Sequence, residues 1–78
     1  MKLTKTEKII LKNTDEKYKY IARDEWGGLY VYTLEPYKKI SKNQLGCWSN
    51  HMEVANLFVF NHLFQDIKWE DEKPYKFR

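Results

Sequence analysis

Residues 18–34 constrain the fold more than any other stretch, because they have the pattern of two β-strands joined by a short turn. β-branched and aromatic residues dominate both runs, 18–23 and 29–34, and these residue types favour strands. The linking residues include the adjacent pair Gly27 and Gly28, and glycine tolerates the positive φ angles that a tight reversal needs. The sequence therefore predicts a β-hairpin.

The register of this hairpin depends on the length of its loop, because side chains alternate between the two faces of a strand. A four-residue loop pairs Ala22 with Leu29 and mixes residue types on each face. A five-residue loop pairs Ala22 with Tyr30 and places the tyrosines of both strands together. Hairpin loops of this kind commonly end in a type I turn followed by glycine. We therefore favour the four-residue loop, with Gly27 in the left-handed region.

The size of the chain limits how much core it can form. At 78 residues it is expected to be one domain, 1–78, with residues 1–4 and 73–78 mobile, and a domain this small buries only about 60% of its unfolded surface. Six Tyr, four Phe and three Trp compensate, because each ring can bury about 150–250 Å². A small sheet with one short helix cannot cover both of its faces. We therefore expect the remaining aromatic surface to meet a partner or a second copy in a homo-oligomer.

The N-terminal segment has a helix start signal. Thr4 and Glu7 have the spacing of a capping box, which predicts a short helix over residues 5–12. The consecutive apolar residues 9–11 would suit an edge strand equally well.

The remainder of the chain predicts short strands and loops. Pro36 ends the second strand of the hairpin because it has no N–H for the ladder, and the basic residues 37–44 are expected to form a mobile loop before a strand over 45–49. The densely apolar segment 51–65 is ambiguous between helix and strand. We assign a strand to 57–60, a helical turn to 61–65 with Asn61 as N-cap, a last strand to 67–69 and a charged tail to 70–78.

Together these elements predict an α+β fold. We expect a small antiparallel sheet of three to five short strands, built on the hairpin at about 18–34, with one or two short helices.

Charge is unevenly distributed along the chain. Residues 1–45 contain ten Lys and Arg against six Asp and Glu, whereas residues 46–78 contain four against five. The basic half favours an anionic partner on the hairpin side, but a formal net charge of +3 is far from the dense basic stripe of a duplex-DNA-binding protein. The charge also excludes a DNA mimic, which needs a strong negative excess.

Cysteine and apolar content bear on location. The single Cys47 cannot form an intrachain disulfide, and no apolar run is long enough for a membrane helix or a signal peptide. We therefore expect a reducing, intracellular environment and no membrane association.

Catalytic and metal-binding patterns are weak. Cys47, His51 and His62 are the soft ligands of the chain, but structural zinc needs four ligands in tight pairs and a catalytic zinc needs three with oriented partners. A Cys–His nucleophile would need a third, orienting group that the sequence does not identify. We therefore expect no metal, no cofactor and no enzymatic activity, with Cys47 as a small buried residue.

One group of residues has chemical promise, because aromatic rings interleave with cations. Rings stack on nucleobases and cations neutralise phosphates, which fits a nucleotide or single-stranded nucleic acid. The competing interpretation is that most of the tyrosines build the core and that neighbouring lysines such as Lys17, Lys38 and Lys39 keep the protein soluble. The candidate ligand-binding residues are Tyr18, Lys19, Tyr20, Arg23, Trp26, Tyr30, Tyr32 and Trp48.

Two motifs carry a resemblance to a known group of proteins. The chain has YKYIARD at residues 18–24 and IKWEDEKP at residues 67–74, with Pro36 and Trp48 between them. With these it resembles small uncharacterised proteins encoded by phages and prophages of Gram-positive bacteria, over residues 18–74.

The resemblance implies a context. Very small non-structural phage proteins are often inhibitors of bacterial defence, so it implies a non-enzymatic accessory protein in the host bacterial cytoplasm. The mechanism that we favour is sequestration of a nucleotide signal by a homo-oligomer, with rings stacking a base and Arg23 holding phosphate. One alternative is a protein-binding inhibitor of a host defence effector, such as a CRISPR nuclease, with exposed rings as anchors. Another is a module that binds single-stranded nucleic acid.

Overall fold

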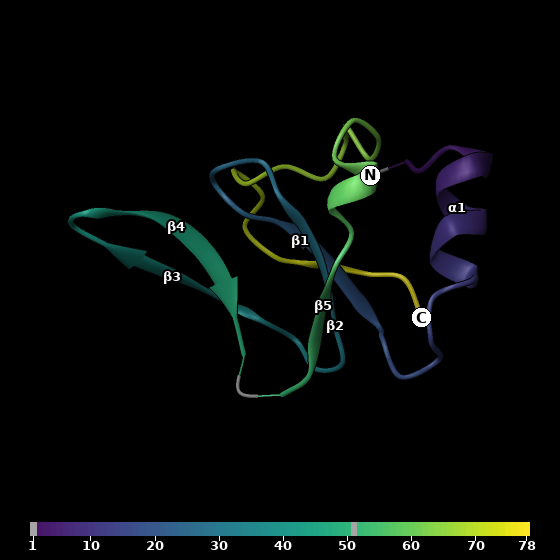
Figure 1. The fold of residues 1–78 in the computed structure, drawn as a ribbon, viewed down its shortest axis with the longest axis horizontal. Helices are drawn as coiled ribbons and strands as arrows, with labels where there is room; N and C mark the ends of the chain where they lie inside the picture. The colour runs from purple at the N-terminus through teal and green to yellow at the C-terminus, as the bar shows by residue number, and fades with distance from the viewer. Residues whose placement is uncertain (1, 51) are drawn as a thin grey trace.

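The computed structural model describes residues 2–50 and 52–78 and confirms the predicted α+β fold (Figure 1). A four-stranded antiparallel sheet has the strand order β5-β2-β1-β6, and β3 and β4 form a separate two-stranded sheet. The elements are α1 (Lys5–Lys12), β1 (Tyr20–Arg23), β2 (Leu29–Tyr32), β3 (Tyr37–Ser41), β4 (Gln44–Ser49), β5 (Val54–Asn56), the 3-10 helix η1 (Phe58–Phe60) and β6 (Tyr75–Lys76).

Strands β1 and β2 form the predicted hairpin with the five-residue loop. Ala22 pairs with Tyr30 and Arg23 pairs with Leu29, so the four-residue register that we favoured is wrong. The loop closes one residue later because the Asp24 N–H donates to the carbonyl of Gly28 at 2.9 Å. Gly27 has φ +106°, which confirms the prediction of a left-handed glycine at this position.

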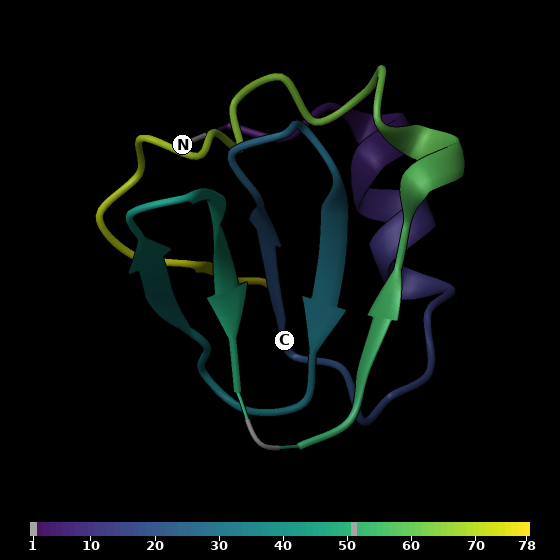
Figure 2. The ribbon, with the colours of Figure 1, turned by 60° about the vertical axis from the view of Figure 1, so that its left-hand side comes forward.

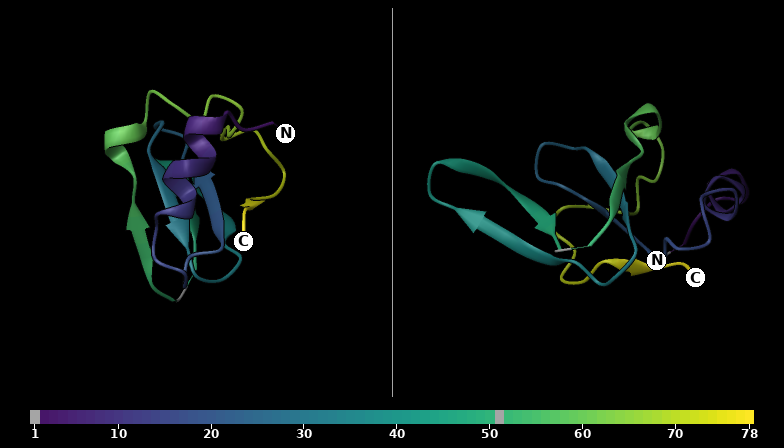
Figure 3. Two further views of the ribbon diagram at one scale, coloured as in Figure 1. Left: turned by 90° about the vertical axis from the view of Figure 1, so that its right-hand side faces the viewer. Right: turned by 60° about the horizontal axis from the view of Figure 1, so that its bottom comes forward.

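This register sorts the hairpin residues by type onto two faces. Ile21 lies opposite Val31 on one face, and Tyr20 lies opposite Tyr32 on the other. The first face, which we call the aliphatic face, packs against α1 and against the chain around Phe64. Figure 3 (left) shows α1 in front of the sheet on this side. Its buried core consists of Leu3, Leu11, Tyr18, Ile21, Leu29, Val31, Phe64 and Ile67.

The second face, which we call the aromatic face, is covered from the opposite side. Ala22 and Tyr32 are buried there together with Trp48 of β4, and Tyr20, Tyr30 and Trp69 pack around them. From the sequence we expected one helix and a sheet with an uncovered face. The separate β3–β4 sheet contributes to the cover of this face through Trp48.

Helix α1 begins with the predicted capping box. The Thr4 hydroxyl accepts from the Glu7 N–H at 3.1 Å, and the Glu7 carboxylate accepts from the Thr4 N–H at 3.0 Å. The second oxygen of Glu7 accepts from the Phe64 N–H at 2.7 Å, which ties the helix to the loop below it. The helix predicted over 5–12 is therefore confirmed, and the edge-strand alternative does not occur.

The mobile basic loop predicted at 37–44 is wrong, because β3 pairs with β4 there. The strand predicted at 45–49 is confirmed and begins one residue earlier. We call residues 37–49 the arm, since they extend away from the main sheet along the longest dimension of a molecule of 37 × 24 × 21 Å (Figures 1 and 2). Lysine is common on edge strands, where it discourages pairing with other chains, and that accounts for a basic strand.

The C-terminal half differs most from prediction. The strand expected at 57–60 is wrong, because most of this segment forms the 3-10 helix η1. The strand of this region, β5, lies just before it and pairs with β2. Asn61 is not an N-cap, because it follows η1 and its side-chain oxygen accepts from the Leu29 N–H at 3.0 Å. Residues 67–69 contain no strand. The free edges of β1 and β2 determine these pairings, and the local sequence does not show where those edges lie.

The expected charged tail contains β6, which pairs with β1. Beyond it, the Arg78 guanidinium donates to the carbonyls of Asp15 and Tyr18 at 2.6 Å each and to Leu11 at 2.9 Å. Mobility of residues 1–4 and 73–78 stays a prediction. Among residues 2–50 and 52–78, no helix has both the length and the apolar character needed to cross a membrane.

Candidate functional site

Arg23, predicted to hold phosphate, points to the aliphatic face and is fully engaged. A guanidinium group has five N–H donors, and all five here donate to backbone carbonyls. Burial lowers the Arg23 pKa from its ordinary value, but arginine keeps its charge. A phosphate-binding role would require one of these bonds to break. The acceptors are Ile67 at 2.7 Å, Gly27 at 2.7 Å, Asn61 at 3.1 Å, Leu63 at 2.7 Å and Phe64 at 3.0 Å.

Two further candidate residues, Tyr18 and Lys19, also lie away from the rings of the aromatic face. Tyr18 is buried in the aliphatic core, with its hydroxyl 3.4 Å from a carboxylate oxygen of Glu53. Lys19 is exposed, and its backbone joins Tyr32 on one side and Phe77 on the other. The structure therefore does not bring Tyr18 and Lys19 to the aromatic face.

Three of the predicted residues do come together around one pocket. Tyr30, Tyr32 and Trp48 line a cavity of about 360 Å³ between the base of the arm and β5, which we call the aromatic cleft. Tyr30 and Tyr32 have ring centroids 6.3 Å apart, and the Tyr32 hydroxyl donates to the Trp48 carbonyl at 3.4 Å. The volume suits a small ligand or a single side chain. The other lining residues are Asp24, Cys47, Ser49, Asn50 and Val54.

A row of rings continues from the cleft across the surface. Phe58 packs edge-on against Tyr30, with centroids 5.0 Å apart, and Trp26 packs edge-on against Phe58, also at 5.0 Å. Trp26 is 49% exposed and Phe58 is 39% exposed. Trp26, a predicted residue, therefore extends the aromatic cleft into an open apolar surface, and Phe58 joins it from outside the predicted set.

Asp24 is a member of the cleft that sequence reasoning did not select. It is only 5% exposed, and its Oδ1 atom accepts from the Trp48 N–H at 2.9 Å. Burial raises the pKa of this carboxyl group, and the hydrogen bond from Trp48 opposes that shift. In the sequence, Asp24 is the first residue of a turn, which is a common place for aspartate, so no local signal pointed to a site.

The carboxylate of Asp24 affects the pKa of the two tyrosines in the cleft. Burial raises the pKa of the Tyr30 and Tyr32 hydroxyl groups, and the nearby charge of Asp24 raises both further. Both phenols therefore stay protonated at neutral pH and can donate hydrogen bonds. Within the lining of the cleft, Asp24 is the single residue with a formal charge at neutral pH.

The loop of the β1–β2 hairpin fixes the base of the arm. The Glu25 side chain accepts from the Gly46 N–H at 2.7 Å, and the Gly46 carbonyl accepts from the Glu25 N–H at 3.1 Å. The Trp48 indole donates to the Arg23 carbonyl at 3.1 Å. Gly46 also leaves room for Trp69, because a Cβ atom there would lie 2.4 Å from the Trp69 ring. These contacts hold Trp48 rigidly beside Asp24.

Cations lie near the aromatic face but outside the cleft lining. The Lys38 ammonium stands 4.5 Å from the centroid of the Trp69 ring and 5.3 Å from that of Trp48. Lys17 forms an ion pair with Glu53, and Lys39 is exposed on the arm. The interleaved cations of the sequence are therefore dispersed and do not form one phosphate-binding cluster.

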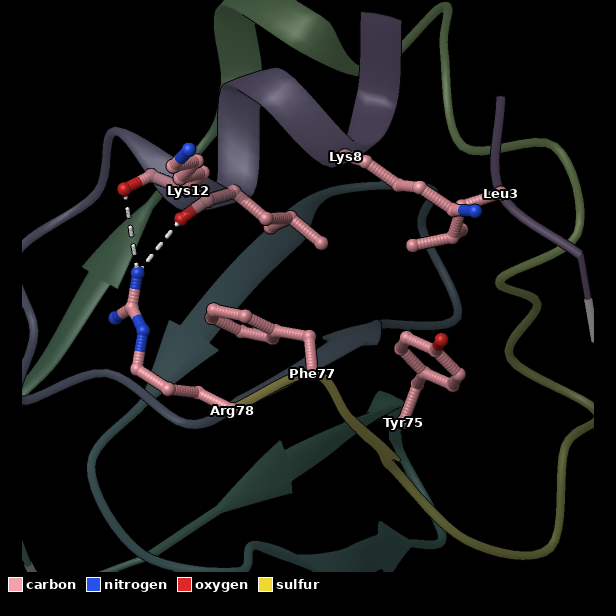
Figure 4. Close-up of a pocket in the computed structure, with 7 residues that line it drawn as sticks. Leu3, Lys8, Lys12, Tyr75, Phe77 and Arg78 are labelled. Atoms are coloured by element: carbon pink, nitrogen blue, oxygen red, sulfur yellow. Dashed lines mark hydrogen bonds between the residues drawn. The ribbon is translucent and has the colours of Figure 1, made fainter. Parts of the chain in front are cut away.

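A second pocket, of about 310 Å³, lies between α1 and the C-terminal segment (Figure 4). Its floor contains Tyr75 and Phe77, and Lys8 and Lys12 lie on the helix side. Figure 4 shows the Arg78 guanidinium turned toward carbonyls at the end of the helix. None of the predicted ligand-binding residues lines this pocket.

Metal binding gains no geometric support among the described residues. Within 2–50 and 52–78, no group of three or more His, Cys, Asp or Glu side chains is arranged to hold a metal ion. His51, one of the three soft ligands considered in the sequence, lies outside the described residues.

Comparison with protein-family models, with curated proteins and with solved structures finds no match to this chain. Function is therefore inferred from the chemistry of the aromatic cleft and its surroundings.

Proposed function

We propose that this protein is a non-enzymatic phage accessory protein that counters bacterial immunity by binding a protein of the host. The observation that favours a protein partner is the character of the aromatic cleft, which combines rings with a carboxylate and has no cation in its lining; the phage context comes from the resemblance over residues 18–74. A phosphate group in the cleft would face Asp24, while Lys38 lies outside the lining, 5.3 Å from the centroid of the Trp48 ring. Protein interfaces, by contrast, are rich in Tyr and Trp anchors.

Exposed apolar side chains outside the cleft support a protein partner. Ile40 and Leu45, at the outer end of the arm, are 75% and 62% exposed, and Val59 beside Phe58 is 74% exposed. Large exposed apolar side chains on a small protein are typical of interaction surfaces. The arm and the ring row would grip the partner, and the cleft between them would receive one of its side chains.

The test is a plating assay in bacteria that carry defined defence systems. Expression of the protein should raise the plating efficiency of a restricted phage by at least about tenfold for one system, and the purified protein should co-elute with the effector of that system on gel filtration. Ile40→Ser tests the arm, and Ile9→Ser is the matched control because Ile9 is exposed on α1. Absence of rescue in every system would refute the proposal.

Capture of a nucleotide signal is the second candidate, and the ring pocket favours it. A volume of about 360 Å³ between Tyr30 and Trp48 could accept a base stacked on a ring. Its phosphates would have to point away from Asp24 toward solvent. This mechanism predicts the same rescue in the plating assay, but with the signal nucleotide bound to the protein and no effector in the complex. The homo-oligomer expected for this mechanism stays a prediction, which analytical ultracentrifugation checks.

A further inference from the structure

We infer that the aromatic cleft receives the basic side chain of a lysine or arginine residue of the partner, with the rings around its stem and Asp24 at its charged end. The inference rests on the proposed function and names the chemistry that the cleft recognises.

The charge of the cleft selects the ligand class. Tyr30, Tyr32 and Trp48 are among its lining residues, with Tyr32 and Trp48 mostly buried behind the surface. The one formal charge in the lining is the carboxylate of Asp24, and Lys38 lies outside the lining, 5.3 Å from the centroid of the Trp48 ring. The face of an aromatic ring is electronegative and attracts cations, most strongly when water is excluded. Rings and carboxylate therefore act in the same direction, toward a positive group and against an anion.

Asp24 also has hydrogen-bonding capacity to spare. Within residues 2–50 and 52–78, its Oδ1 atom accepts from Trp48, and its Oδ2 atom makes no hydrogen bond. Every buried side-chain oxygen or nitrogen of these residues has a hydrogen-bond partner, so the unbonded Oδ2 atom must be accessible to solvent. Asp24 borders both the aromatic cleft and a neighbouring polar pocket. A guanidinium or ammonium group supplies the N–H donor that Oδ2 lacks.

Glu7, the other buried acid of the described chain, is a carboxylate whose two oxygens both have hydrogen-bond partners. Glu7 is 6% exposed, similar to Asp24, but both of its oxygens accept backbone N–H groups, from Thr4 and Phe64. Glu7 has a structural role that uses its acceptors. Asp24 is equally buried, but within residues 2–50 and 52–78 only one of its two oxygens accepts a hydrogen bond. The other oxygen can therefore accept one from a ligand.

The burial of Asp24 gives the interaction a pH dependence. Desolvation raises the pKa of the free carboxyl group, and a bound cation would lower it again because opposite charges favour the ionised form. Binding should therefore release protons, and affinity should fall as the pH drops through the pKa of the free protein. The other side chains around Asp24 that titrate or carry charge are Tyr30, Tyr32 and Cys47 in the cleft, Lys38 over the Trp48 ring, and Arg23, Glu25, Lys68 and Glu70 in a neighbouring polar pocket.

The experiment is an NMR titration of the whole protein with three probes of similar length. Nα-acetyl-arginine amide and Nα-acetyl-lysine amide carry the cation, and Nα-acetyl-norleucine amide carries only the stem. The cationic probes should cause saturable shifts at the Trp48 indole with dissociation constants of about 1 mM, as a single side chain allows. The norleucine probe should bind at least about tenfold more weakly.

Variants assign the effect to the carboxylate. Asp24→Asn keeps an oxygen acceptor for the Trp48 N–H and should weaken binding of the cationic probes by about tenfold. Glu25→Gln is the matched control, because Glu25 is the next residue in the loop, does not line the cleft and keeps its acceptor for Gly46. Its affinity should equal that of the wild type. Tyr30→Leu, a second variant, removes one ring wall and should weaken binding about threefold to tenfold.

Equal binding of the norleucine and cationic probes, or unchanged affinity in both Asp24→Asn and Tyr30→Leu, would overturn the inference. Tighter binding of adenosine or guanosine monophosphate than of the arginine probe at the same residues would also overturn it, in favour of nucleotide capture. The proposed function fails separately, if the wild-type protein rescues phage plating against no defence system.

Discussion

The two faces of the β1–β2 hairpin have opposite designs. The centre of the aliphatic face is closed: Ile21, Leu29 and Val31 are at most 1% exposed. The hydrogen bonds of Arg23 and Glu7 are satisfied there, and the cavity on this side lies between α1 and the C-terminal segment. The aromatic face is partly open, with a cavity bordered by rings and by a half-used carboxylate. Arg23 and Asp24 are neighbours in sequence and both border a polar pocket, but Arg23 is fully bonded to backbone carbonyls and Asp24 also lines the aromatic cleft.

This difference supports the proposal that the aliphatic face stabilises the fold and that the aromatic face binds a partner. Buried aliphatic side chains and a fully bonded guanidinium give stability but present nothing to a ligand. On the aromatic face, Trp26 and Phe58 are still partly exposed. Within residues 2–50 and 52–78, Asp24 accepts a hydrogen bond only through its Oδ1 atom, so this face can still gain contacts by binding. We therefore expect substitutions on the aliphatic face to change the free energy of unfolding, and substitutions on the aromatic face to change binding more than stability.

The largest expected effect is at Arg23. Arg23→Ala removes the donors of five backbone carbonyls at once and should lower the free energy of unfolding by about 3 kcal/mol or more. Arg23→Lys should recover little, because an ammonium group has three donors and no planar fork. Urea unfolding followed by circular dichroism measures both. Lys19→Ala, on an exposed neighbouring side chain, is the control and should change stability by less than about 0.5 kcal/mol. A stable Arg23→Ala protein that had lost ligand binding would contradict the closed role of this face.

An intermediate effect is expected at Gly46, where the arm joins the aromatic face. Gly46→Ala places a Cβ atom 2.4 Å from the Trp69 ring, so the ring must shift, at a cost of about 1–3 kcal/mol. The variant should show a lower melting temperature together with altered NMR shifts at Trp48. Leu45→Ala is the control, since Leu45 is exposed at the outer end of the arm. Equal stability of the two variants would mean that the contact of the arm with Trp69 is not rigid.

A smaller effect is expected in the pH dependence of stability. Because burial raises the Asp24 pKa, the folded state binds this proton more tightly than the unfolded state. The contribution of Asp24 to stability is therefore greatest below the ordinary aspartate pKa and falls as the pH rises through the raised value. Asp24→Asn should remove this part of the slope. Urea unfolding of both proteins between pH 3 and 7 measures it, and identical slopes would contradict a raised pKa.

The smallest effect is expected at the Lys17–Glu53 ion pair. The two side chains are exposed, 44% and 57% respectively, and exposed pairs contribute about 0–1 kcal/mol because water screens them. Lys17→Ala should lower the free energy of unfolding by less than about 0.5 kcal/mol. A loss of more than about 1 kcal/mol would show that this edge of the aliphatic core is less closed than its buried residues indicate.

Local signals in the sequence predicted local structure well. The capping box of Thr4 and Glu7 predicted α1, and the aromatic runs around Gly27 predicted the hairpin. The register depended on a single loop residue, and both loop lengths satisfied the local pattern. The arm was missed because a run rich in lysine is as typical of a loop as of an exposed edge strand.

The candidate site was predicted in composition rather than in geometry. Alternation along the strand predicted that Tyr30 and Tyr32 share a face in either register, but only the five-residue loop places Tyr20 of β1 on that face with them. Sequence alone could not show that Arg23 donates to four carbonyls that lie 38 to 44 residues away, nor that Asp24 accepts from Trp48 of the arm. Such contacts join segments distant in the chain, and no local pattern encodes them.

The most direct test of the account is an NMR map of where a cation binds. In a titration of ¹⁵N-labelled protein with Nα-acetyl-arginine amide, the account predicts the largest shifts at Asp24, Tyr30, Trp48 and Asn50, around the aromatic cleft. Residues of the aliphatic core, such as Leu11 and Phe64, should not respond. Largest shifts at the pocket beside α1, or no saturable shifts anywhere, would contradict the claim that the open aromatic face is the receptor surface of this protein.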